Sequence, residues 1–374
     1  MTWHFDWLRS WEEIWDAGHL SDWRSLIAGG RTNATPFMHP DVIRAWLDAT
    51  GGEAAYDPFF LAARHAGGQR VLWLLVRQRG GWGSGFQRAM VPAGSVGLGG
   101  PHFAYNDPLV APVDDSGSVL APGFWSGLER ELRRREGDWF DVCSVPRLRT
   151  TCLGGVDARP TAQSSTWVSL APYADFGAYL AARRPSMLKD IERKSRRLDA
   201  AGRHDFHVHG PGEAEAVLAW LPDLVEATAA RYPDTEVPAA FMRALVHRCL
   251  DSGVVHGSVV RLEGQPISWR LSYVLDGTLY CGMRCFDPRF ERLSPGLLHS
   301  YRSMEWLFGQ GGRAYDALIG QQAYKYDWTD GDEHALHRWR VESRARGTHL
   351  RRQARRIIAR LGGRGADDPS VAAG

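Results

Sequence analysis

Two polar segments in the second half of the sequence carry the side chains best suited to chemistry. The first runs from Ser294 through Pro295 to Gly296, after an expected strand. Serine is favoured just before a helix, proline suits the first helical position, and glycine lets a ligand approach the backbone. Free N–H groups and the helix dipole at such a terminus bind anions. Arg289 and Arg292 precede it and can add charge-assisted hydrogen bonds to a pyrophosphate. An ordinary capped helix explains the segment equally well.

The second segment is the strand ending near Asp316 and the polar loop that follows it, which contains Tyr324 and Lys325. A phenol with a reference pKa of about 10 and a neighbouring ammonium can act as proton donor and oxyanion stabiliser in an acyl transfer. Only three of the 45 basic residues are lysines, which is a weak reason to expect a specific use for Lys325. The simpler interpretation is an aromatic cluster at a strand end with a solvated lysine.

A basic run between residues 183 and 203 forms a third candidate site. Arg193 and Arg197 share one face of its expected helix, where they can contact phosphate. A solvated helix face explains the run equally well, and both interpretations stay open. A second basic helix is expected after residue 344, as a contact for anionic lipid or RNA or, more simply, as a solvated cap.

Metal binding and membrane insertion are not expected. Cys281 and Cys285 lack a matching Cys or His pair, and His207 and His209 are interpreted as surface histidines. An odd number of cysteines, five, in a long chain indicates reduced thiols and a cytoplasmic protein. No run reaches the about 18 apolar residues that a transmembrane helix needs.

Length and composition describe an ordinary globular protein. The chain has 374 residues, of which 44% are hydrophobic and 24% charged. Single cores stop growing near about 250 to 300 residues, so two domains are expected. The net charge of +2 gives no global attraction to nucleic acid or to an acidic membrane.

The pattern of elements predicts a mixed α+β fold. Tryptophans at three- and four-residue spacing from Trp3 to Trp15 predict an apolar helix face. In the second half, helices are expected before three strands over 255–263, 265–275 and 278–286. Asp276-Gly277 is a strong two-residue hairpin signal between the last two strands. A helix over 295–308 and strands over 313–318 and 335–341 follow.

These motifs together resemble the CelD-type acetyltransferase family of the GNAT superfamily, which is related to FemAB proteins. The resemblance extends over nearly the whole chain and is most specific between residues 180 and 330. It rests on Arg193–Leu198 with Gly202, on Phe286–Phe290 with Leu293–Gly296, on Tyr315-Asp316 with Gly320, and on Tyr324–Trp328. In the first half it rests on Pro36-Phe37, His39-Pro40, the helix with Trp46, and Tyr105–Pro108.

The resemblance implies two tandem GNAT-like domains, each a mixed, largely antiparallel sheet flanked by helices. The expected boundaries are 1–160 for a degenerate N-terminal domain, 161–345 for the acyltransferase domain, and 346–374 for a basic helix and tail. Acetyl-CoA or another acyl-CoA is the implied co-substrate, without a metal. The residues expected to bind it are Arg289, Arg292, Ser294, Gly296 and Leu297.

The resemblance implies acyl transfer to a primary amine, and we expect direct attack of the neutral amine on the acyl carbonyl without a covalent enzyme intermediate. Tyr324 is expected to protonate the leaving group, Lys325 to stabilise the oxyanion or to bind a phosphate of the acceptor, and Asp316 to act as base. Contacts to the acceptor are expected from Asn106, Asp107, Arg193 and Arg197. The acceptor is a small molecule, an amino sugar or a polysaccharide precursor. Two alternatives remain: aminoacyl-tRNA as donor, as in FemAB relatives, or a non-catalytic accessory role in envelope polysaccharide synthesis. The oligomeric state is left open.

Overall fold

The computed structural model describes residues 3–79, 88–96, 102–113, 119–234, 236–329 and 331–345. Its strands are β1 (Trp3–Leu8), β2 (Tyr56–His65), β3 (Arg70–Gln78), β4 (Ala89–Pro92), β5 (Leu109–Ala111), β6 (Val142–Arg149), β7 (Arg159–Ser169), β8 (His204–His209), β9 (Val255–Leu262), β10 (Gln265–Leu275), β11 (Thr278–Phe286), β12 (Ala314–Ile319) and β13 (His334–Glu342). Its helices are α1 (Trp11–Ile14), α2 (Ala17–Ala28), α3 (Pro40–Ala49), α4 (Phe124–Arg134), α5 (Phe176–Ala181), α6 (Pro185–Ala201), α7 (Ala214–Arg231), α8 (Ala239–Cys249) and α9 (Pro295–Gly309).

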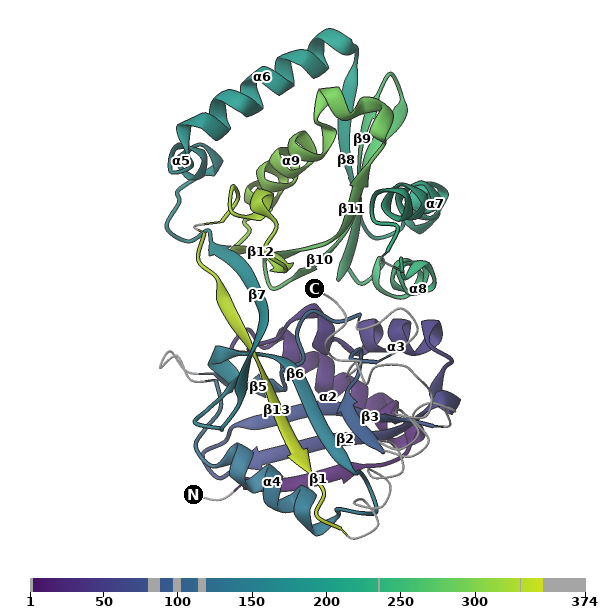
Figure 1. The fold of residues 1–374 in the computed structure, drawn as a ribbon, viewed down its shortest axis with the longest axis vertical. Helices are drawn as coiled ribbons and strands as arrows, with labels where there is room; N and C mark the ends of the chain where they lie inside the picture. The colour runs from purple at the N-terminus through teal and green to yellow at the C-terminus, as the bar shows by residue number, and fades with distance from the viewer. Residues whose placement is uncertain are drawn as a thin grey trace, which may run out of the picture.

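Within these described residues the strands join into one mixed sheet with helices on both of its faces (Figure 1). The strand order is β1-β2-β3-β4-β6-β13-β7-β12-β11-β10-β9-β8, with β5 paired to β3. Most neighbours are antiparallel, whereas β4 with β6 and β11 with β12 are parallel. This confirms the expected α+β class with a mixed, largely antiparallel sheet flanked by helices.

The helices cover the sheet because each has one apolar face. In the first half, α4 packs with Phe124, Leu128 and Leu132 in one hydrophobic core, while α2 and α3 belong to another on the opposite face. In the second half, α7 and α8 lie on one side of β8–β11, and α9 and α6 lie on the other (Figure 1). The core around α3 also includes Phe241 and Met242 of α8, so it joins the two halves of the molecule.

Two strands connect the halves. β7 pairs with β12 of the second half, and β13 pairs with both β7 and β6. The two run together from the lower to the upper part of the molecule in Figure 1. Trp339 of β13 lies in the first-half core, with its ring 4.8 Å from that of Trp125. The expected domain boundaries at residues 160 and 345 stay a prediction, and the tail over 346–374 lies outside the described residues.

The expectation of one apolar helix face from Trp3 to Trp15 is wrong at its start. Residues Trp3–Leu8 form β1, which pairs antiparallel with β2. Trp3 and Trp7 also alternate with exposed residues, as a strand requires, and Trp3 packs 5.1 Å from Phe124 between ring centroids. Helix begins only at Trp11, after a capping box in which the Ser10 hydroxyl accepts from the N–H of Glu13.

None of the helices in the described part of the chain is long and apolar enough to span a membrane.

Replacing Trp339 with alanine tests whether β13 holds the first-half core together. The Trp339 side chain is 3% exposed, so Trp339→Ala leaves a large cavity and should lower the free energy of unfolding by about 3–5 kcal/mol. Trp167→Ala is the matched control, because Trp167 is 42% exposed on β7 and should cost about 1 kcal/mol or less. Urea denaturation followed by fluorescence measures both. Equal losses in the two variants would contradict this packing.

Candidate functional site

The central feature of the site is an opening between two parallel strands. β11 and β12 pair only from Thr278↔Ala314 to Tyr280↔Asp316, although each continues further within the described residues. Both strands are irregular just beyond this point. The β10–β11 register shifts between Leu271 and Tyr273, and the β12–β7 register shifts between Asp316 and Ile319. Because such bulges bend strands, they turn β11 and β12 away from each other.

Two backbone positions allow this divergence. Gly282 lies so close to the neighbouring strand that a Cβ atom there would be 2.3 Å from the carbonyl oxygen of Leu271, which only glycine avoids. Leu318 of β12 has a φ of 59°, in the left-handed region that non-glycine residues rarely adopt. Unusual backbone of this kind is often retained at functional sites.

A cavity of about 930 Å³ lies at the opening. It is lined by the ends of β11 and β12 that do not pair with each other, by the start of α9, by Tyr324 and Lys325, and by residues of β10 and α8. The first half of the chain contributes Phe37, residues 102–104 and Arg147. The volume is in the range of sites for cofactors and small substrates.

Tyr324 and Lys325, which are expected from the sequence to be catalytic, both line this cavity. Lys325 is buried and donates to the carbonyl oxygen of Ile319 and, at 3.5 Å, to that of Leu318, at the irregular end of β12. Burial lowers the pKa of Lys325 to about 8. Tyr324 is 37% exposed, and burial raises the pKa of its hydroxyl although the charge of Arg284 opposes the rise. The phenol is therefore protonated near neutral pH and can donate a proton.

Asp316 lies behind the cavity rather than in its lining. Its carboxylate accepts hydrogen bonds from the Tyr105 hydroxyl at 2.9 and 3.0 Å and from the N–H of Leu318 at 2.7 Å. Burial raises the pKa of Asp316 to about 6, against the lowering effect of these hydrogen bonds. The Tyr105 bond connects the two halves and fixes the end of β12.

The expected anion site at the start of α9 is only partly assembled. α9 begins at Pro295 as predicted, and Ser294, Gly296 and Leu297 line the cavity. Ser294 has a left-handed backbone and makes no capping hydrogen bond through its side chain. Arg289 is exposed and pairs with Asp287 at 2.5 Å, and Arg292 is also exposed. Neither arginine is in the cavity lining.

The residues expected to contact the acceptor lie away from the cavity. Asp107 is buried and accepts a hydrogen bond from the backbone N–H of Arg149 at 2.8 Å, besides its ion pair with that side chain. The side-chain amide of Asn106 is buried without a hydrogen-bond partner, beside a small cavity of about 20 Å³. Arg193 and Arg197 are exposed on α6, where Arg193 forms an ion pair with Asp190.

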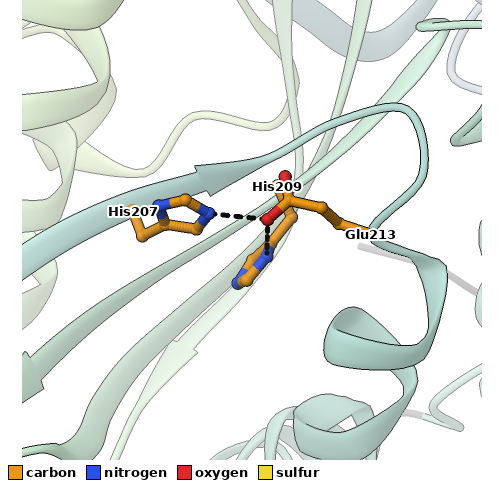
Figure 2. Close-up of side chains that lie close together, drawn as sticks. All are labelled: His207, His209 and Glu213. Carbon is orange, nitrogen blue, oxygen red and sulfur yellow. Dashed lines mark hydrogen bonds and ion pairs between the residues drawn. The ribbon is translucent and has the colours of Figure 1, made fainter.

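A separate polar cluster at the edge of the sheet could hold a metal ion. His207 Nε2 and His209 Nδ1 lie 2.9 and 3.2 Å from the same carboxylate oxygen of Glu213 (Figure 2). The other carboxylate oxygen accepts from the N–H of Gly210 at 3.0 Å, which orients the group. Imidazole and carboxylate ligands suit zinc. These residues are at the junction of β8 and α7 and do not line the large cavity.

Sequence reasoning missed a buried polar group on β10, β11 and α9. Arg270, Arg284 and Ser300 line the cavity, with His299 beside them. His299 lies between the hydroxyls of Ser258 and Ser268, at 2.8 and 2.9 Å. Burial lowers its pKa well below the usual value, and the two guanidinium charges lower it further, so the ring is neutral. A charged residue inside each apolar strand was the signal available in the sequence.

Comparison with known proteins assigns this part of the chain to a family. Residues 185–326 match the family model described as an acetyltransferase (GNAT) domain. The chain therefore carries a GNAT-type acetyltransferase domain and is an acyltransferase, and its resemblance to the GNAT superfamily is confirmed. The matched residues include both diverging strands, α9, Tyr324 and Lys325. No curated protein matches the sequence.

Solved structures share the fold over most of the chain. A C-terminal DUF2156 domain of a putative lysylphosphatidylglycerol synthetase from Agrobacterium fabrum has a TM-score of 0.53 at 11% identity, covering 92% of this chain and 97% of that one. FemX has a TM-score of 0.52 at 8% identity, with coverage of 83% and 94%. A conserved protein of unknown function from Bacteroides thetaiotaomicron has a TM-score of 0.52 at 10% identity, with coverage of 87% and 97%. At these identities the likeness concerns the fold.

The raised pKa of Asp316 predicts a pH dependence of stability. A carboxyl group whose pKa is about 6 in the folded chain and 3.8 in the unfolded chain binds more protons when folded between these values. The free energy of unfolding therefore falls as pH rises from about 4 to about 6, because the folded chain must give up a proton that it binds more tightly. The loss reaches up to about 3 kcal/mol. Asp316→Asn should remove this loss while keeping the shape of the side chain. Urea denaturation from pH 4 to pH 7 measures the difference between the two proteins. A difference that does not change with pH would show that Asp316 titrates normally.

Proposed function

We propose that the protein is an N-acyltransferase that moves an acyl group, acetyl in the simplest case, from acyl-CoA to a primary amine. The acceptor is a small molecule, an amino sugar or a polysaccharide precursor. The observation that carries the proposal is the opening between β11 and β12, which leads into a cavity containing Tyr324 and Lys325 within the matched family region. An extended thioester arm placed between the strand ends can pair with backbone groups that no neighbouring strand uses.

Direct attack needs few groups, and the cavity supplies them. The amine nitrogen forms a bond to the acyl carbonyl carbon, and the carbon–sulfur bond then breaks. Lys325 stabilises the oxyanion, because its ammonium has three donors and the two carbonyl bonds leave one for the substrate. Tyr324 gives its proton to the leaving thiolate, and the proton released by the amine returns to the phenol through solvent.

Two other groups position this machinery. Asp316 has no contact with the cavity, so we assign it no proton transfer; through Tyr105 and Leu318 it fixes the irregular end of β12. Ser294, Gly296 and Leu297 place the start of α9 at the cavity, where the N–H groups of a helix start favour the phosphates of the donor. Arg289 and Arg292 are close in sequence to this helix start, but they do not line the cavity, so they can contact the donor only outside it.

The five cysteines are all free and buried, which suits a reducing compartment. We therefore place the reaction in the cytoplasm, where acyl-CoA is available.

Aminoacyl-tRNA is the second candidate donor. It is favoured by exposed arginines on α6, among them Arg193, Arg196 and Arg197, which offer a surface for phosphate contacts. A donor held in this way would lose affinity steeply with increasing salt, whereas a CoA thioester held in the cavity would lose much less.

Turnover measurements with substituted cavity residues test the proposed function. Release of CoA from acetyl-CoA is followed with a panel of primary amines that includes amino sugars. Lys325→Met should lower kcat by about 10²-fold or more, because the oxyanion loses its charged donor. Tyr324→Phe should lower kcat by about 10²-fold, because the thiolate must leave unprotonated.

The control is Lys189→Met, which removes an exposed ammonium on α6 that does not line the cavity and should leave turnover unchanged. Circular dichroism establishes that each variant is folded. Full turnover by a folded Lys325→Met protein would remove Lys325 from the mechanism. Absence of acyl transfer from acetyl-CoA to any amine, with transfer from aminoacyl-tRNA instead, would overturn the proposed donor.

A further inference from the structure

Two arginines face each other across neighbouring strands in the interior. Arg270 of β10 and Arg284 of β11 are direct partners in the antiparallel register. Like charges at such positions repel each other, and a buried charge is costly unless it is paired. Arg270 is 1% exposed, and its Nε and Nη1 atoms are buried without a hydrogen-bond partner. The folded chain therefore maintains an unfavourable arrangement of charge at the cavity.

The contacts of the pair orient it without neutralising it. Both guanidinium groups donate to the hydroxyl oxygen of Ser300, Arg270 at 2.8 Å and Arg284 at 2.7 Å. Ser300 in turn donates to the carbonyl oxygen of Gly296 at 3.1 Å, in the first turn of α9. The Arg284 guanidinium also lies 3.7 Å from the centre of the Tyr324 ring. The hydroxyl and the ring are both uncharged, so the net charge of the pair remains.

No carboxylate of the described residues bonds to either guanidinium. The acidic residues in the cavity lining are Glu236 and Glu291, and both are exposed. His299, the neighbouring titratable group on α9, is neutral. Cys281 is the remaining candidate for negative charge: burial raises the pKa of its thiol, and the charges of Arg270 and Arg284 outweigh this and lower it. One thiolate would still leave one positive charge in excess.

We propose that Arg270 and Arg284 bind an anionic group, a carboxylate or a phosphate, of a molecule that enters the cavity. Guanidinium groups match these anions in planar, two-bond geometry, and a water-excluded site strengthens the bonds. The claim that this molecule is a substrate of acyl transfer rests on the proposed function. It follows from the position of Arg284, which stacks on Tyr324 in the same cavity. The anion would lie beside the phenol that protonates the leaving group.

Thermal unfolding in different sodium salts at equal ionic strength tests the binding itself. Chloride, acetate and phosphate are compared on the wild-type protein, Arg284→Met and Arg302→Met. Met keeps most of the length of the arginine stem and removes the charge. Arg302 is the matched control because it forms an exposed ion pair with Glu305 on the same helix as Ser300. Phosphate raises the Tm of most proteins because it is excluded from the protein surface. A specific site is therefore shown by a difference in Tm shift between the variants.

Replacing chloride with acetate or phosphate should raise the Tm of the wild-type protein and of Arg302→Met. This rise should exceed the rise in Arg284→Met by about 2 °C or more. In chloride, Arg284→Met should unfold no earlier than the wild-type protein, because it relieves repulsion. Equal gains in all three proteins would overturn the anion site. A Tm of Arg284→Met below that of the wild type in chloride, with no anion effect, would show that the arginines are purely structural. Arg270→Met, measured in the same way, decides the matter if Arg284→Met fails to fold.

Titration calorimetry and kinetics then identify the source of the anion. If Arg284→Met weakens coenzyme A binding by about tenfold or more, the anion is a donor phosphate. If coenzyme A binding is unchanged and KM rises about tenfold only for amines that carry a carboxylate or phosphate, the anion belongs to the acceptor. No change in either quantity would remove the pair from substrate binding. Turnover of neutral amines by the wild-type protein is a separate readout, so the proposed function can hold even if the anion site fails.

Discussion

The short parallel pairing of β11 with β12 is the constraint on which the site depends. Three residue pairs join the strands, and then bulges on both sides turn them apart. At the first bulge a side chain on Gly282 would clash with the carbonyl oxygen of Leu271, and at the second Leu318 has a left-handed backbone. The opening places a cavity in the middle of the sheet, and its walls include the ends of β11 and β12 that do not pair with each other. Helix α9 and the loop with Tyr324 and Lys325 then only have to reach that opening.

The first half of the chain completes the site rather than standing beside it. Its residues form part of the cavity wall, and the Tyr105 hydroxyl bonds to Asp316 at the base of the opening. The shared strands β7 and β13 and the core between α3 and α8 hold the halves in this relation. The cavity lining is chemically mixed, because it contains aromatic and aliphatic side chains as well as Arg270, Arg284 and Ser300. One cavity thus offers both apolar surface for an acyl group and positive charge for an anionic group.

Local signals in the sequence were sufficient for β9, β10, β11, α9, β12 and β13. Asp276-Gly277 predicted the turn between β10 and β11, and both residues have positive φ in the structure. Pro295 predicted the start of α9. The start at Trp3 was mispredicted, because the spacing of the tryptophans fits a helix while Phe5 between them fits a strand. The pair of Arg270 with Arg284 depends on strand register, and the bond from Tyr105 to Asp316 joins residues 211 positions apart. Neither is encoded in local spacing.

Calorimetric titration of acetyl-CoA into the wild-type protein and into Met283→Trp tests most directly whether the opening is the donor site. Met283 lies on the end of β11 that does not pair with β12, and it lines the cavity. A larger ring at this position fills the space while Tyr324 and Lys325 remain unchanged. Binding by the wild-type protein that is weakened about tenfold or more in a folded Met283→Trp is the expected result. Equal binding by both proteins, or no binding by the wild type, would contradict a donor site between β11 and β12.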